Sequence, residues 1–66
     1  MDKQIVAKKL RLLRGDRKRE EVAIACGITA QAIAMYESGK RIPSDDIKVK
    51  IANFFGTTVQ QIFFEI

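Results

Sequence analysis

The side chains of this chain that could do chemistry are mainly cationic, and most of them gather in its N-terminal third. Seven lysines and arginines lie within twelve residues and are opposed only by Asp16: Lys8, Lys9, Arg11, Arg14, Arg17, Lys18 and Arg19. Such a cluster can be a solvated face, or it can bind nucleic acid or another anionic surface. Charge alone leaves both interpretations open.

The remaining residues do not indicate a catalytic site or a metal site. The chain has no histidine and a single cysteine, Cys26. No nucleophile paired with a base can be recognised, no glycine-rich loop suits a phosphate, and one cysteine cannot build a zinc site. We therefore expect neither an enzyme nor a cofactor or metal. Cys26 falls in an apolar slot, so we interpret it as core filling rather than as a redox sensor.

Length and charge limit what the chain can form. Its 66 residues predict one domain, residues 1–66, with a net charge of +4. A domain this small is marginally stable, and no internal disulfide is possible, so stability must come from well-packed helices, from oligomerisation or from both. Nothing resembles a signal peptide or a membrane span. We expect a cytoplasmic protein with no membrane partner.

Short helical patterns separated by glycine and proline predict an all-α fold. The expected helices span about residues 3–14, 17–26, 29–38, 44–55 and 58–66. Asp16 is expected to cap the second helix and Thr29 the third. Thr58 and Gln61 have the spacing of a capping box at the start of the last helix.

Residues 22–36 have the spacing of two helices joined by a tight turn. Ala23 is small enough for a neighbouring helix to cross close to it, and Gly27 can adopt the turn conformation. Ile33 can fill the angle between the two helices. This spacing predicts a helix-turn-helix over about residues 17–38, whose second helix is held outward at a fixed angle.

Over nearly its whole length the chain resembles the Cro and cI repressor family, also called the XRE or lambda-repressor-like family. The most specific segment is the run Tyr-Glu-Ser-Gly-Lys-Arg-Ile-Pro-Ser at residues 36–44. The resemblance also includes residues 10–14, 20–23, 27–29, 33, 51–52 and 56–58. It implies a compact five-helix, lambda-repressor-like DNA-binding domain with the helix-turn-helix at its second and third helices.

The resemblance implies that the third helix is a recognition helix in the major groove of DNA. The residues expected to face the bases are Gln31, Ala30, Ala34 and Met35. Only Gln31 can form a bidentate pair, with adenine, whereas the alanines and Met35 can make apolar contacts or allow close approach. We therefore expect few hydrogen bonds to base edges. DNA shape should supply a larger share of the specificity, and phosphate contacts a larger share of the affinity.

The family pattern also suggests which side chains contact phosphates and which are structural. The expected phosphate contacts are Lys18, Arg19, Thr29, Ser38, Lys40 and Arg41. Thr29 could instead only cap its helix, and Lys40 with Arg41 could be a solvated pair. Arg14 and Glu37 match a structural ion pair of the family.

Two departures from the family pattern affect the second helix. The family usually has serine or threonine before this helix and glutamine at its start, where this chain has Lys18 and Arg19. The stretch between Arg14 and Ala23 is also about two residues short. Arg19 would therefore reach a phosphate as a charge and not as an amide.

The segment 58–66 ends in more apolar side chains than a free terminus needs. Phe63, Phe64 and Ile66 could complete the core, but we favour a dimer interface for at least some of them. Dimerisation would place two recognition helices about one turn of DNA apart, roughly 34 Å, on an inverted repeat. The expected function is a Cro-like repressor with no small-molecule ligand. An antitoxin-type or other protein-interaction module with the same fold is the alternative.

Overall fold

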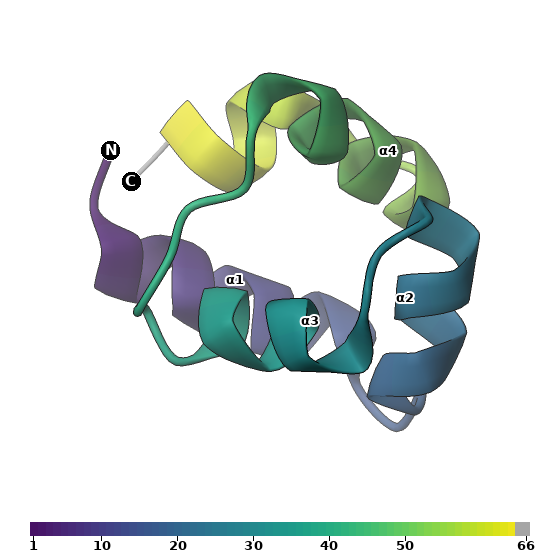
Figure 1. Ribbon diagram of the computed structural model, residues 1–66. Coiled ribbons are helices and arrows are strands. Elements are labelled where there is room, and N and C mark those ends of the chain that lie inside the picture. The colour runs from purple at the N-terminus through teal and green to yellow at the C-terminus, as the bar shows by residue number, and fades with distance from the viewer. Residues whose placement is uncertain (65–66) are drawn as a thin grey trace.

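The computed structural model describes residues 1–64, and it contains no strand in that range. Helices α1 (Lys3–Arg14), α2 (Arg19–Cys26), α3 (Ala30–Glu37) and α4 (Asp45–Phe55) are followed by a short π-helix, η1 (Gln60–Phe64) (Figure 1). The prediction of an all-helical fold with five helices is confirmed. No helix within these residues is long and apolar enough to span a bilayer.

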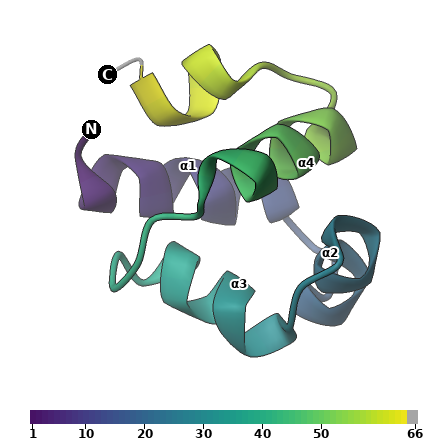
Figure 2. The same ribbon diagram turned by 45° about the horizontal axis from the view of Figure 1, so that its top comes forward.

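The helices pack so that α3 occupies one side of the molecule. α3 packs against α1 and α2, α2 also packs against α4, and η1 lies against α1. Figure 2 shows η1 and α3 on opposite sides, with α1 and α4 between them. One side of α3 therefore remains open to solvent, while the other contributes to the core.

A single apolar core joins all five helices. Its buried side chains are Val6, Leu10, Val22, Ala23, Cys26, Ile33, Tyr36, Ile51, Ala52, Ile62 and Phe63. Burial of each large apolar side chain stabilises the fold by roughly 1.5–3 kcal/mol relative to exposure. Cys26 is 1% exposed, which agrees with its interpretation as core filling. Burial raises the pKa of the Cys26 thiol, and the nearby charge of Lys50 only partly opposes this effect.

The connection between α1 and α2 differs from the prediction. α2 begins at Arg19 and not near residue 17, and its cap residue is Lys18, which makes no side-chain capping hydrogen bond. The expected cap by Asp16 is wrong. The Arg17 N–H donates to the Arg14 carbonyl at 3.1 Å, so the chain forms a tight turn after α1 and Asp16 lies too early to reach the first amides of α2.

The turn between α2 and α3 forms as the spacing predicted. Gly27 has φ 69° and ψ 31°, a left-handed conformation that a side chain would resist. The Ile28 N–H closes the turn on the Ala23 carbonyl at 3.0 Å. Both Ala23 and Ile33 are buried at the junction of the two helices.

Hydroxyl caps begin α3 and η1. The Thr29 Oγ1 accepts the Ala32 N–H at 3.0 Å, and the Thr58 Oγ1 accepts the Gln61 N–H at 3.1 Å. The predicted capping box is only half formed, because the Gln61 side chain accepts a hydrogen bond from the Thr57 hydroxyl instead of reaching back to Thr58.

The loop after α3 depends on a glycine for two reasons. Gly39 has φ 78°, and a Cβ atom there would lie 2.4 Å from the Gln4 Nε2 of α1. Gly56 has a similar φ of 68° but no atom within 4 Å of such a Cβ. Comparison of Gly39 with Gly56 therefore separates two reasons for a glycine: the positive φ, which both share, and the close approach of Gln4, which affects only Gly39.

We predict that Gly56→Ala lowers the free energy of unfolding by roughly 1–2 kcal/mol, because alanine resists the left-handed region. Gly39→Ala should lower the free energy of unfolding by at least as much. If it lowers it by more, adding Gln4→Ala to Gly39→Ala should restore the difference, because the Gln4 side chain no longer crowds the new Cβ atom. Urea denaturation of the four variants, including the double variant Gln4→Ala/Gly39→Ala, checks this. A Gly39→Ala protein as stable as the wild type would contradict the assigned loop conformation.

Candidate nucleic-acid interface

The outer side of α3 is small and almost without charge. Gln31 is exposed there, and Ala34 and Met35 are half-buried. Ala30 is also half-buried, but it packs against the apolar core. The opposite side of α3 is buried through Ile33, Tyr36 and Glu37 and anchors the helix. Of the four side chains expected to face bases, Gln31 is thus the most accessible and the only one that can donate or accept a hydrogen bond.

The two hydroxyls at the ends of α3 are not equally available. The Thr29 oxygen accepts the Ala32 N–H, which leaves its own O–H free to donate. The Ser38 hydroxyl donates to the Met35 carbonyl at 3.1 Å. A phosphate accepts hydrogen bonds, so Thr29 can cap its helix and bind an anion at once, whereas Ser38 must first release Met35.

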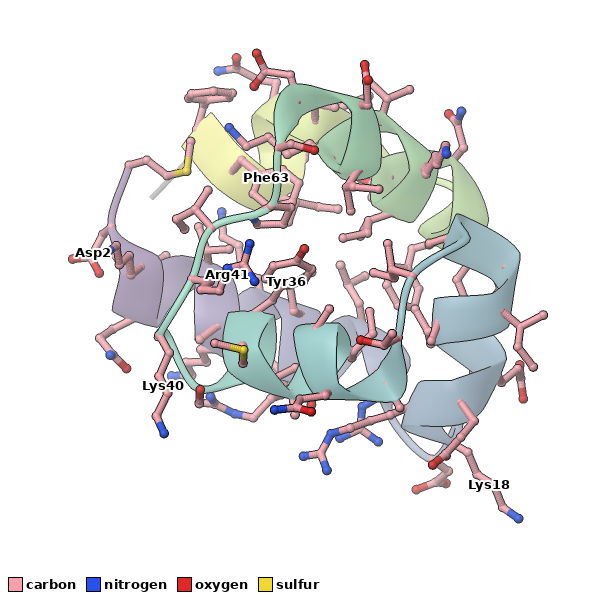
Figure 3. All side chains as sticks on the ribbon, in the orientation of Figure 1. Asp2, Lys18, Tyr36, Lys40, Arg41 and Phe63 are labelled. Atoms are coloured by element: carbon pink, nitrogen blue, oxygen red, sulfur yellow. The ribbon has the colours of Figure 1, made fainter. Side chains whose placement is uncertain are left out.

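Exposed cations flank α3. In Figure 3, Lys18 and Lys40 project from the body on either side of α3, along the lower edge of the view. Arg41 is also exposed, but it lies higher on the segment that leads from α3 to α4 (Figure 3). In this view Lys40 projects near the C-terminal end of α3 and Lys18 near the start of α2, whereas Arg41 lies closer to the centre of the molecule.

A buried carboxylate fixes the C-terminal end of α3. Glu37 is 3% exposed. Its Oε2 lies 2.6 Å from the Arg14 Nε, and its Oε1 lies 3.0 Å from the Arg14 Nη2. The ion pair expected from the family resemblance is therefore present and bidentate. The hydrogen bond to Glu37 raises the pKa of Arg14, against a smaller opposing effect of burial.

Two further arginines reach the same end of α3, and the sequence did not indicate either contact. The Arg19 Nε lies 3.1 Å from the Glu37 Oε1, while the Arg19 side chain is 47% exposed. The Arg11 Nη1 donates to the Glu37 backbone carbonyl. Arg19, which was expected to contact only phosphate, is thus also part of the ion network.

The comparisons with known proteins agree with this geometry. A family model described as helix-turn-helix matches residues 8–62. The chain belongs to the XRE-type helix-turn-helix family. An uncharacterized HTH-type transcriptional regulator of Methanocaldococcus jannaschii is 40% identical over 45 residues, which make up 68% of each of the two chains. No solved structure matches.

Membership of this family assigns a general role. The family consists of transcriptional regulators that bind DNA, and it is not a family of enzymes. This helix-turn-helix protein is therefore a DNA-binding transcriptional regulator, and the predicted family is confirmed. Within residues 1–64, no group of three or more cysteine, aspartate or glutamate side chains is placed to hold a metal ion.

At the C-terminal end of the domain, the structure separates the residues expected at a dimer interface. Phe63 is 2% exposed and packs in the core, so it is not available on the surface for a partner. The adjacent Phe64 is 54% exposed. Ile66 lies outside the described residues. Only Phe64 remains as a described surface residue from this set.

A buried lysine that the sequence did not reveal supports η1. Lys48 is 7% exposed. Its Nζ lies 3.4 Å from the Asp45 Oδ1 and over the rings of Phe63 and Phe64, at 5.7 and 5.4 Å from their centroids. The contact ties α4 to η1 through a cation–π interaction. The spacing of three residues from Asp45 was the one available signal.

We predict that Glu37→Ala lowers the free energy of unfolding by about 3 kcal/mol, since it leaves Arg14 without its carboxylate. Glu37→Gln should lose less, because its amide oxygen can still accept one hydrogen bond. Thermal denaturation followed by circular dichroism checks both variants, with the exposed Glu20→Gln as control. If Glu37→Ala melted at the wild-type temperature, the ion network would not hold α3.

Proposed function

We propose that this regulator is a Cro-like repressor that binds an inverted-repeat operator as a homodimer and blocks polymerase sterically. The observation that carries the proposal is α3, a helix whose outer side is uncharged and exposes Gln31, that is anchored by Glu37 and flanked by exposed cations. An uncharged helix can enter the major groove while the cations beside it meet the phosphates. The proposed place of action is the bacterial cytoplasm or nucleoid.

In this proposal Gln31 reads adenine through a bidentate pair. Ala30, Ala34 and Met35 make apolar contacts, for example with thymine methyl groups. Because these side chains are uncharged and the alanines are small, α3 can approach the base edges closely. One hydrogen-bonding side chain per subunit gives limited discrimination. DNA shape and deformability then supply a larger share of the specificity.

The proposed phosphate contacts surround α3. They are Lys18, Arg19, Thr29, Ser38, Lys40 and Arg41. Thr29 and the two lysines are the best placed of these, because the Thr29 O–H is free and the lysines project from the body of the molecule (Figure 3). Each neutralised phosphate should add about 0.9 to the slope of log affinity against log salt concentration.

The proposed dimer interface includes Phe64. The ring is more than half exposed although Lys48 holds it, and large exposed aromatic groups are common at interfaces. η1 lies away from α3 (Figure 2), so a second subunit docked at Phe64 would not contact α3 itself.

The test of this proposal is selection from random duplex DNA at near-physiological salt, followed by sequencing of the bound pool. We expect an enriched inverted repeat with half-sites about one helical turn apart, roughly 34 Å. Enrichment of a single half-site would overturn the dimeric operator. Salt-sensitive retention without any enrichment would overturn sequence-specific repression and favour a protein-interaction module.

We predict that Gln31→Ala relaxes the preference at one base pair in each half-site by about tenfold, which corresponds to a discrimination of roughly 1–3 kcal/mol for a bidentate pair. Equilibrium binding to duplexes changed at single positions measures this preference. Gln60→Ala, which removes an exposed glutamine from η1, is the matched control. An unchanged preference in Gln31→Ala would exclude Gln31 as the reader.

We predict that Phe64→Asp abolishes self-association, because a charge replaces an apolar group that the partner would bury. Sedimentation velocity over a range of protein concentrations measures the oligomeric state. Ile24→Asp is the control, since Ile24 is an apolar residue of α2 that is 81% exposed. A dimer that survives Phe64→Asp would place the interface elsewhere.

A further inference from the structure

We propose that Glu37 is a positioning residue for DNA binding, because its buried carboxylate holds Arg19 so that the free end of that guanidinium meets a backbone phosphate. The proposal rests on the proposed function but concerns a different step, the preparation of one phosphate contact before DNA arrives. Glu37 itself would not touch DNA.

The geometry of Arg19 leaves most of its donors unused. Its Nε donates to the Glu37 Oε1 at 3.1 Å, and Arg19 makes no other side-chain hydrogen bond within residues 1–64. A guanidinium has five N–H donors in a planar fork, so four remain on the two Nη atoms. The side chain is 47% exposed, which gives these atoms access to a ligand.

Arg14, on the same carboxylate, is used differently. Its Nε and Nη2 both donate to Glu37, and its Nη1 donates to the Arg17 carbonyl at 2.9 Å. The Arg14 side chain is also less exposed, at 20%. Arg14 is therefore a structural partner, while Arg19 is the cation of the pair that can still bind an anion.

The local charge balance favours an anionic ligand. One carboxylate, that of Glu37, is shared by two guanidinium groups, and the guanidinium of Arg11 lies at the backbone carbonyl of the same residue. These three guanidinium groups and one carboxylate together carry more positive than negative charge. A phosphate oxygen on the Nη atoms of Arg19 would neutralise part of that excess with charge-assisted hydrogen bonds.

Restraint of Arg19 should increase its contribution to affinity. A free arginine loses rotamer freedom when it is fixed on a ligand, and part of that loss is already incurred when Glu37 holds the side chain. The carboxylate also attracts the same cation that the phosphate needs. The two effects predict opposite results when the Glu37 charge is removed: loss of positioning weakens DNA binding, whereas loss of competition strengthens it. The proposal requires that the positioning effect is the larger one.

The test is a double-variant cycle on binding to a mixed-sequence duplex, with Arg19→Gln, Glu37→Gln and the combination, measured at several salt concentrations below each variant's melting temperature. Phosphate contacts do not depend on sequence, so the cycle remains informative even if the operator proposal fails. Arg19→Gln should weaken binding about fivefold to tenfold and lower the salt slope by about one. In the Glu37→Gln background, the same change should weaken binding less than twofold.

The control is Lys18→Gln, an exposed neighbour that contacts no carboxylate within residues 1–64 and should lose the same affinity in both backgrounds. Equal loss from Arg19→Gln in both backgrounds, or tighter binding by Glu37→Gln alone, would overturn the proposal.

If Glu37→Gln did not fold, Arg19→Lys would decide. A lysine ammonium lacks the planar fork by which one arginine binds carboxylate and phosphate in fixed directions, so Arg19→Lys should bind more weakly than the wild type, and wild-type affinity would refute the proposal.

Discussion

The Glu37 carboxylate is the interaction on which the rest of this structure depends. It is buried at the end of α3, where it accepts hydrogen bonds from Arg14 of α1 and Arg19 of α2. A buried charge without partners would be strongly destabilising, so the three helices are confined to arrangements that bring both guanidinium groups to one point. The orientation of α3, and with it the surface offered to DNA, follows from that constraint together with the apolar packing of Ile33 and Tyr36.

This constraint explains how a small domain can present a helix that has few polar and no charged side chains on its outer side. Rigid placement does not need polar residues on the exposed side, because the anchoring groups are buried behind it. The outer side can then be apolar, with Gln31 as its one exposed hydrogen-bonding side chain and Ala34 and Met35 half-buried beside it. Affinity is left to the cations that flank α3, whose contacts depend on the position of the DNA backbone and not on its sequence.

Local features of the fold could be predicted from the sequence, and contacts between distant elements largely could not. Gly27 and the Thr29 cap act within a few residues, so spacing alone located the turn and the start of α3. The start of α2 was missed because the Arg17–Arg14 turn makes Asp16 too early to cap it. Phe63 and Phe64 lie on a π-helix, where 3.6-residue periodicity does not tell the buried ring from the exposed one. The second ion pair of Glu37 and the burial of Lys48 depend on which long side chains meet in space.

The most direct test of this account is the NMR behaviour of the arginine Nε–H groups in uniformly ¹⁵N-labelled protein. The account predicts that the Nε–H groups of Arg14 and Arg19 exchange with water more slowly than that of Arg41, whose side chain makes no hydrogen bond within residues 1–64. It also predicts that Glu37→Gln shifts the Arg14 and Arg19 signals and leaves the Arg41 signal in place. An Arg19 Nε–H that exchanges as fast as that of Arg41, and does not respond to Glu37→Gln, would contradict the shared carboxylate at the centre of the fold.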